Sequence, residues 1–236
     1  ADEEMDESYL VLSEAQQNIV KKNNDFAFKL YQQISGMDSE VVSPMSIAYL
    51  MGMLANGADG MTQQEILKAI GCEGVSVKEL NDCYKALMLS AGKLDKQTTV
   101  NIANFIAINK NFTLNSDFAR TVAVSYQAGV ESMDFTSPKS ATRINDWCKK
   151  QTKGMIPSII DQVDPAAVSY LLNAIYFNGI WQEKFDAKNT RLENFSGYTR
   201  DIKKVNMMHL NKKFAYTEND MLQAVELPYG NGSYQM

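Results

Sequence analysis

Apolar residues recur with helical spacing along much of the N-terminal half of the chain. The pair Ser43-Pro44 predicts a helix start, because serine caps a helix N-terminus and proline suits the first helical position. Thr62 and Glu65 form a capping box for another helix, which we expect to end at Gly71. The predicted helices are 23–34, a segment from Pro44, 62–70, 77–91, 116–127 and 138–153.

A second pattern, rich in β-branched and aromatic residues, predicts strands in the middle and in the C-terminal part of the chain. The predicted strands are 98–109, 129–135, 168–177, 191–196, 202–209, 213–217 and 222–227. Helices come first and strands come later, with mixing between them. This order predicts an α+β fold.

The most informative stretch is VSYLLNAIYFNGIW, residues 168–181, in which Asn173 interrupts an apolar run. Such a run predicts a strand buried on both faces, with Leu171, Asn173, Ile175 and Phe177 pointing to one side. A buried amide without a hydrogen-bond partner costs about 1–3 kcal/mol. We therefore expect Asn173 to have polar partners inside the protein.

Charge is distributed unevenly along a chain of otherwise ordinary globular composition. Six of its 28 acidic residues lie within residues 1–20, which contain no basic residue, and the remaining 22 face 23 basic residues. We interpret residues 1–20 as an acidic tail or linker. No basic surface that would hold nucleic acid is indicated.

The sequence also bears on the compartment of the protein. No stretch is long and apolar enough to predict a membrane span. The three cysteines, Cys72, Cys83 and Cys148, do not make a disulfide framework. Because the chain begins with Ala1, we expect either that a leader has been removed or that the chain is trimmed.

Candidate catalytic and metal-binding residues are scarce. His209 is the only histidine, and it lies in a strand-like segment among apolar neighbours, so neither a Ser-His-Asp nor a Cys-His site is indicated. One histidine and scattered cysteines give no zinc set, and the glycines match no phosphate-binding or dinucleotide-binding fingerprint. We expect no metal and no cofactor. This scarcity of catalytic residues favours a binding or inhibitory protein over an enzyme.

Four segments in order resemble the serpins, the family of serine protease inhibitors. VSPMSIAYLMGMLANGADGMTQQEI resembles their second helix and the turn after it. INDWCKKQTKGMI resembles the helix that crosses their main sheet. LLNAIYFNGIWQEKFD and VNMMHLNKKFAYTENDMLQAVELPY resemble the third strand of that sheet and the strands that follow it.

The resemblance implies a serpin fold, in which helices surround a large central sheet and two smaller sheets. Residues 21–236 would form the N-terminal part of a single serpin domain. The C-terminal part with the reactive loop would lie outside this chain, so the loop and its target cannot be read here. We expect that remainder as a partner, either in one polypeptide or as a separate chain.

The resemblance also assigns roles to residues. Ser43, Ser46 and Asn173 match the "shutter" beneath the centre of the main sheet, where the serine hydroxyls would bond the asparagine. Trp181 matches the "breach" tryptophan at the top of the sheet. From the residues alone, Ser43 could be only a helix cap, Asn173 a local bulge and Trp181 a core tryptophan.

The implied function is protease inhibition through a conformational change. A serine or cysteine protease would cleave the reactive loop, which then inserts into the main sheet and traps the enzyme. Strand 168–177 would be one of the two strands that part, and helix 139–152 would have to yield. The alternative is a non-inhibitory serpin that acts as a binding, carrier or chaperone protein. A secreted, cell-surface or periplasmic location is expected.

Overall fold

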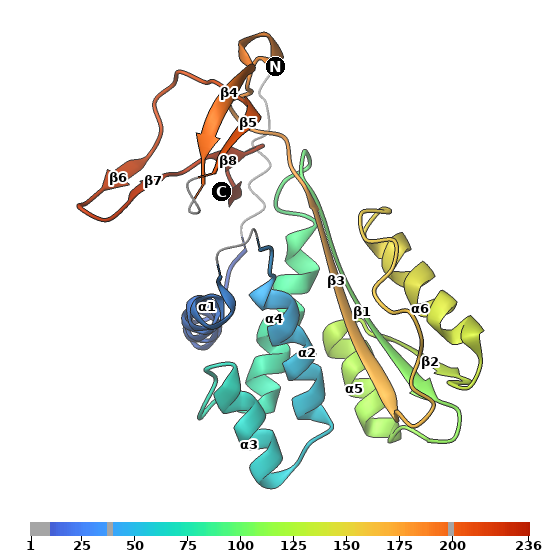
Figure 1. Ribbon diagram of the computed structural model, residues 1–236. Helices are drawn as coiled ribbons and strands as arrows, with labels where there is room; N and C mark the ends of the chain where they lie inside the picture. Colours follow the sequence, from blue (N-terminus) through green and yellow to red (C-terminus); the bar gives the residue numbers. More distant parts are fainter. Residues whose placement is uncertain (1–9, 37–39, 198–200) are drawn as a thin grey trace, which may run out of the picture.

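The computed structural model describes residues 10–36, 40–197 and 201–236 (Figure 1). Its helices follow the predicted pattern, except that α1 starts earlier than predicted. They are α1 (Glu14–Ile34), α2 (Pro44–Asn56), α3 (Gly60–Ala69), α4 (Val77–Ala91), α5 (Ser116–Tyr126), α6 (Pro138–Gln151) and the short 3-10 helix η1 (Ala187–Asn189).

The first helix starts earlier than the sequence pattern predicted. Ser13 and Gln16 form a capping box, so α1 begins at Glu14, and Ile19 in its second turn is 2% exposed. The expected tail of residues 1–20 therefore ends before residue 14, because residues 14–20 are helical and contribute to the core. Residues 1–9 of that tail lie outside the described residues.

A three-stranded sheet forms the centre of the described chain. It consists of β1 (Thr99–Asn109), β2 (Gly129–Met133) and β3 (Ser169–Asn178), in the order β2-β1-β3. β1 runs parallel to β2 and antiparallel to β3. Within the described residues β3 pairs along its length with β1 alone, so its other edge has no neighbouring strand there.

The C-terminal part consists of antiparallel ribbons, which completes the predicted α+β fold. The pairs are β4 (Arg191–Ser196) with β5 (Ile202–Met207), β6 (Tyr216–Glu218) with β7 (Gln223–Val225), and β8 (Pro228–Tyr229) with β9 (Tyr234–Gln235). The segments predicted over 202–209 and 213–217 are shorter than expected, and His209 lies beyond the end of β5.

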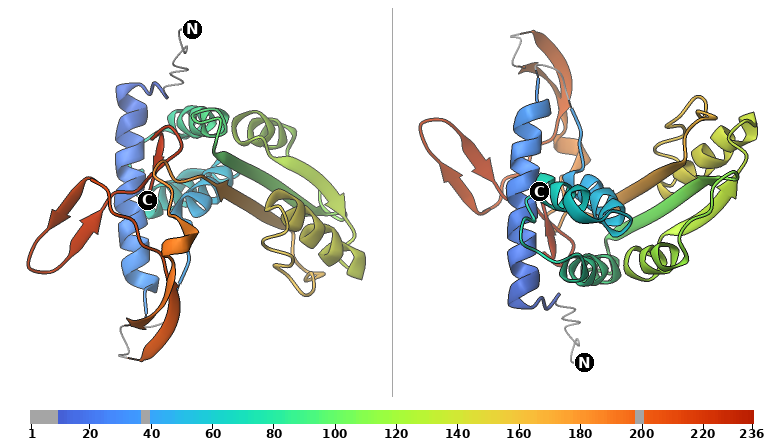
Figure 2. Two further views of the ribbon diagram at one scale, coloured as in Figure 1. Left: turned by 90° about the horizontal axis from the view of Figure 1, so that it is seen from above. Right: turned by 90° about the horizontal axis from the view of Figure 1, so that it is seen from below.

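The central sheet carries helices on both faces (Figures 1 and 2). Successive side chains of a strand point to opposite faces. Leu171 and Ile175 accordingly pack into the core shared with α2, α4 and α5, whereas Leu172 and Ala174 pack into a second core beneath α6. The predicted common face of Leu171 and Ile175 is confirmed. α1 contacts α2 and α4, on the side of these helices away from the sheet.

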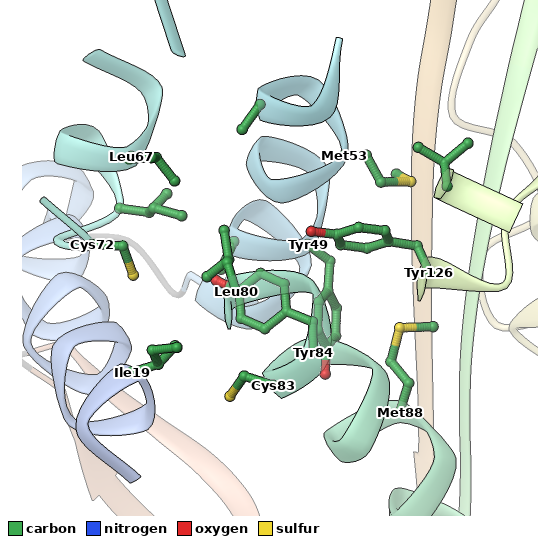
Figure 3. Close-up of a cluster of buried hydrophobic side chains, with 14 of the residues drawn as sticks. Ile19, Tyr49, Met53, Leu67, Cys72, Leu80, Cys83, Tyr84, Met88 and Tyr126 are labelled. Carbon is green, nitrogen blue, oxygen red and sulfur yellow. The ribbon is translucent and has the colours of Figure 1, made fainter. Parts of the chain in front are cut away.

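The larger core is built around three buried tyrosines (Figure 3). Tyr84 makes edge-to-face contacts with Tyr49 and Tyr126, at ring-centroid distances of 4.9 and 6.1 Å. Aromatic pairs in this geometry stabilise a core beyond the burial of their surface. No helix in the described ranges is long and apolar enough to cross a membrane.

Candidate functional site

Asn173 pairs with a second asparagine in the middle of the β1–β3 ladder. Asn104 is its direct partner in the register, and Nδ2 of Asn173 donates a 2.8 Å hydrogen bond to Oδ1 of Asn104. Asn104 is 3% exposed, and its own Nδ2 donates to the backbone oxygen of Tyr126 at 2.7 Å. The polar contact therefore runs across both strands and ends on α5.

One half of the Asn173 amide has no partner. Its Oδ1 atom is buried and accepts no hydrogen bond from any described residue. An unsatisfied buried acceptor costs about 1–3 kcal/mol. Asn173 thus bonds β1 through its amide nitrogen. Its amide oxygen remains free to accept a hydrogen bond, and it lies on a strand whose second edge has no neighbouring strand among the described residues.

The two serines expected beside Asn173 bond each other instead. Ser43 is the N-cap of α2, and its Oγ accepts from the backbone nitrogen of Ser46 at 3.3 Å and from Oγ of Ser46 at 3.1 Å. The expected hydrogen bonds from these hydroxyls to Asn173 are not formed, which corrects that part of the prediction. The helix-capping role of Ser43 is confirmed, and the side-chain partner of Asn173 comes from β1.

The sequence held a signal for Asn104 that the pattern analysis missed. Asn104 interrupts the run of residues 98–109 on the face that carries Ile102 and Ile106, as Asn173 interrupts its own run. Two asparagines that interrupt apolar runs in two predicted strands could have been matched to each other. Pairing them requires the register of β3 on β1, which depends on contacts between residues far apart in the sequence.

Trp181 packs the end of β3 against the hairpin formed by β8 and β9. Its ring stacks on Tyr229 with centroids 4.2 Å apart and an interplanar angle of 14°, and it also meets Phe185 edge to face. The backbone of Trp181 forms an isolated bridge with Tyr229. Gly179 makes this approach possible, because a Cβ there would lie 2.7 Å from Cδ1 of Tyr229.

The β8–β9 hairpin contacts the loop before β1 through Asp95 and Leu94. Oδ2 of Asp95 accepts from Oγ1 of Thr98 at 2.6 Å, and Gly230 lies so close that a Cβ there would overlap the same Oδ2 atom. Burial alone would raise the pKa of Asp95, but the donors from Thr98, Gln97 and Asn231 outweigh it and lower the pKa. The carboxylate therefore stays charged and holds the hairpin turn.

α6 contacts both the central sheet and the segment at residues 159–160 that follows it. Trp147 on α6 stacks on Phe105 of β1 with centroids 5.3 Å apart, and Asn101 of β1 donates to the backbone oxygen of Gln151 at 2.9 Å. Asn145 makes three hydrogen bonds to the backbone of residues 159–160, at 2.7, 2.9 and 3.2 Å. A displacement of α6 relative to the sheet must break the contacts of Trp147 and Asn101.

The titratable groups outside these contacts form no catalytic arrangement that we can identify in the described ranges. His209 pairs with Glu193 at 2.9 Å on the exposed surface. Burial raises the pKa of Cys83 to about 11 and also raises the pKa of Cys72 and Cys148. Among the described residues, no group of three or more His, Cys, Asp or Glu could hold a metal ion.

Comparison with known proteins identifies the family. The family model for "Serpin (serine protease inhibitor)" matches residues 21–236. The chain belongs to the serpin family. The fold and family that the four sequence segments implied are thereby confirmed.

Individual serpins show how far the similarity extends. The leukocyte elastase inhibitor of Equus caballus is 32% identical over 216 residues, covering 88% of this chain and 56% of that protein. The corticosteroid-binding globulin of Pongo abelii is 29% identical, covering 96% of this chain and 58% of that protein. The native-state crystal structure of the thermophilic serpin tengpin superimposes with a TM-score of 0.85 at 28% identity, covering 95% of this chain and 57% of tengpin.

The chain spans somewhat more than half the length of the serpins that it matches. These relatives include an elastase inhibitor and a corticosteroid-binding globulin. Membership of the family therefore fixes the fold and leaves inhibitory and carrier functions as alternatives.

Proposed function

We propose that this chain is the N-terminal part of a serpin that inhibits a serine or cysteine protease. In this proposal the protease cleaves a reactive loop supplied by the C-terminal remainder, and the loop then inserts into the sheet that contains β1 and β3. The remainder is a partner in either form, continuous with this chain or separate from it. The role is inhibitory rather than catalytic.

The observation that carries the proposal is the environment of Asn173. It lies at the centre of β3, on a strand whose second edge has no neighbour among the described residues, and its buried Oδ1 lacks a donor. A strand added at that edge can satisfy the backbone groups of β3, as in other cases of strand addition. It can also bring a side-chain donor within reach of the amide oxygen.

A hydrogen-bonded joint suits a sheet that must open. The Asn104–Asn173 bond can break and form again with a new partner, whereas two interdigitated apolar side chains would oppose separation of the strands. We assign Asn173 to the shutter together with Ser43 and Ser46, which fix the first turn of α2. α2 packs against β3, so its start influences the position of that strand.

The upper end of β3 supports the same mechanism. Trp181, stacked on Tyr229, is the breach residue in this proposal. It would hold the strand end closed until the loop enters beside it. α6 would then shift across the sheet, at the expense of the hydrogen bond from Asn101 and the stacking of Trp147 on Phe105.

The alternative is a non-inhibitory serpin that binds, carries or protects another molecule. The similarity to a corticosteroid-binding globulin favours it, and the similarity to an elastase inhibitor favours inhibition. For either function we propose a secreted, cell-surface or periplasmic location, which the acidic composition at the start of the sequence supports.

The test uses the full-length protein and a panel of trypsin-, chymotrypsin-, elastase- and subtilisin-like proteases, with papain as a cysteine protease. A band of summed mass that survives boiling on a denaturing gel is the expected result. The matched control is each protease after inactivation of its nucleophile, which must give no such band. Cleavage of the native protein without a trapped complex by every protease would favour the non-inhibitory alternative.

A further inference from the structure

A buried chain of amide and phenol groups continues from the sheet into the helices. Asn104 of β1 donates to the backbone oxygen of Tyr126, the last residue of α5, at 2.7 Å. The hydroxyl of the same Tyr126 donates to Oδ1 of Asn81 on α4 at 2.8 Å. Asn81 exchanges two hydrogen bonds with Asn56, the last residue of α2, at 2.8 and 2.9 Å. The path from Asn173 therefore reaches three helices.

The Tyr126 hydroxyl lies in a closely packed, buried position between α2 and α4. Tyr126 is fully buried, and Figure 3 shows it extending from α5 toward the labelled side chains of α2 and α4. A Cβ at Gly52 of α2 would lie 2.5 Å from this hydroxyl, so the glycine provides the space that the phenol occupies. Burial raises the pKa of Tyr126, and the phenol therefore stays protonated as a donor to Asn81.

The backbone oxygen of Tyr126 determines the direction of the two bonds made by Asn104. A carbonyl oxygen only accepts, so the Asn104 amide must turn its nitrogen toward Tyr126 and its oxygen toward Asn173. Asn173 can then bond Asn104 only through its own nitrogen. If the end of α5 moves, Asn104 loses the contact that holds its amide in this orientation.

We propose that Tyr126 is a positioning residue through which helices α2 and α4 set how firmly β1 and β3 are held together at Asn104 and Asn173. Its hydroxyl fixes the residue to the helices, and its carbonyl fixes Asn104. The proposal deepens the proposed function, because strand separation at this point is what loop insertion would require, and it rests on that function for its biological meaning.

A second tyrosine provides a matched control. Tyr84 lies in the same core, is 1% exposed, and donates its hydroxyl to Oδ1 of Asn23 on α1 at 2.9 Å. Its hydroxyl bond leads to α1 and not to Asn104. Tyr84→Phe and Tyr126→Phe each remove one buried phenol hydroxyl from one core, so a purely structural role predicts similar effects for both.

The experiment measures backbone amide hydrogen exchange in the native full-length protein, for peptides covering residues 99–109 and 169–178. We expect Tyr126→Phe to accelerate exchange in these peptides about tenfold, the size expected for a lost buried hydrogen bond, while Tyr84→Phe leaves them at the wild-type rate. Asn56→Ala removes a partner of Asn81 and keeps the Tyr126 side chain itself, and it should accelerate the same peptides about threefold. It keeps the test decisive if Tyr126→Phe does not fold.

Equal exchange in the two tyrosine variants would overturn the proposal, as would unchanged exchange in Asn56→Ala if Tyr126→Phe does not fold. The readout does not depend on protease inhibition. Accelerated exchange in a protein that traps no protease would support the role of Tyr126 and reject the inhibitory function. Covalent trapping together with equal exchange would do the opposite.

Discussion

Asn104 and Asn173 face each other across the β1–β3 ladder and are joined by a 2.8 Å hydrogen bond. Both the nitrogen and the oxygen of the Asn104 amide have hydrogen-bond partners, whereas only the nitrogen of the Asn173 amide has one. Asn104 is satisfied by Tyr126 and Asn173. Asn173 has a buried oxygen that no described donor reaches. This asymmetry makes Asn173 the more informative position to change.

Asn173→Val in the full-length protein is expected to lower the free energy of unfolding by about 1–3 kcal/mol. Valine leaves Oδ1 of Asn104 buried without its donor, and it deletes whatever bond the complete protein makes to Oδ1 of Asn173. Denaturant unfolding measures the change. Ile175→Val, on the same face of β3, should cost only about 0.5–1.5 kcal/mol.

An Asn173→Val variant as stable as the wild type would mean that the loss at Asn104 is cancelled by removal of an acceptor that never finds a donor. In that case no group from the remainder of the protein bonds Asn173, and its assignment to the shutter is wrong.

Ser46→Leu should allow premature opening of the sheet. The substitution removes the hydroxyl that donates to Ser43 at 3.1 Å and places a larger apolar group in the first turn of α2, which packs against β3. Polymers on a native gel after mild heating are the expected result. Met45→Leu, at an exposed neighbouring position, should stay monomeric under the same conditions. Monomeric Ser46→Leu with an unchanged melting temperature would count against the role of Ser46.

Gly230→Ala should undock the last hairpin. Gly230 has φ +46, and a Cβ there would overlap Oδ2 of Asp95, so we expect a loss of about 2–4 kcal/mol. Gly232→Ala is the matched control, because Gly232 has φ +89 with nothing within 4 Å, and backbone strain alone should cost about 1–2 kcal/mol. Equal losses in denaturant unfolding would show that the contact with Asp95 does not hold the hairpin.

The cysteines should be unreactive in the native protein. Burial, with a smaller contribution from Cys72, raises the pKa of Cys83 from 9.0 to about 11, so at pH 8 only about 0.1% of it is thiolate. Mass spectrometry of peptides containing Cys72, Cys83 and Cys148 should show little alkylation before unfolding and complete alkylation in denaturant. Rapid alkylation of the native protein would contradict the burial of these side chains.

The same shift has a consequence for stability. A thiol whose pKa is raised on folding stabilises the folded state fully below its unfolded pKa and loses this contribution as the pH rises through its folded pKa. For Cys83 the loss should fall between pH 9.0 and about 11. Cys83→Ala should flatten the fall in melting temperature over this range.

Local signals predicted most elements of the fold. The Ser43-Pro44 pair marked the start of α2, and the apolar run around Asn173 marked β3, because capping and side-chain alternation depend on neighbouring residues. The start of α1 was placed too late, since the acidic composition of residues 1–20 concealed the capping box at Ser13.

The partner of Asn173 could not be predicted from such signals. The family resemblance suggested the two serines at the start of α2, but the register of β3 on β1 places Asn104 directly opposite Asn173. Register depends on packing over the whole ladder, between residues 69 positions apart. The same holds for the contact of Gly230 with Asp95.

Because the chain is synthesised from its N-terminus, these long-range contacts can form only late in synthesis. β1 is complete well before β3 exists, and Asn231 in the β8–β9 hairpin donates to the backbone oxygen of Leu94, 137 residues earlier in the chain. Closing such loops is slow because their entropy must be lost before the new contacts form. The helices can therefore fold during synthesis, while the edge of β1 that pairs with β3 stays exposed to other chains until β3 has been made.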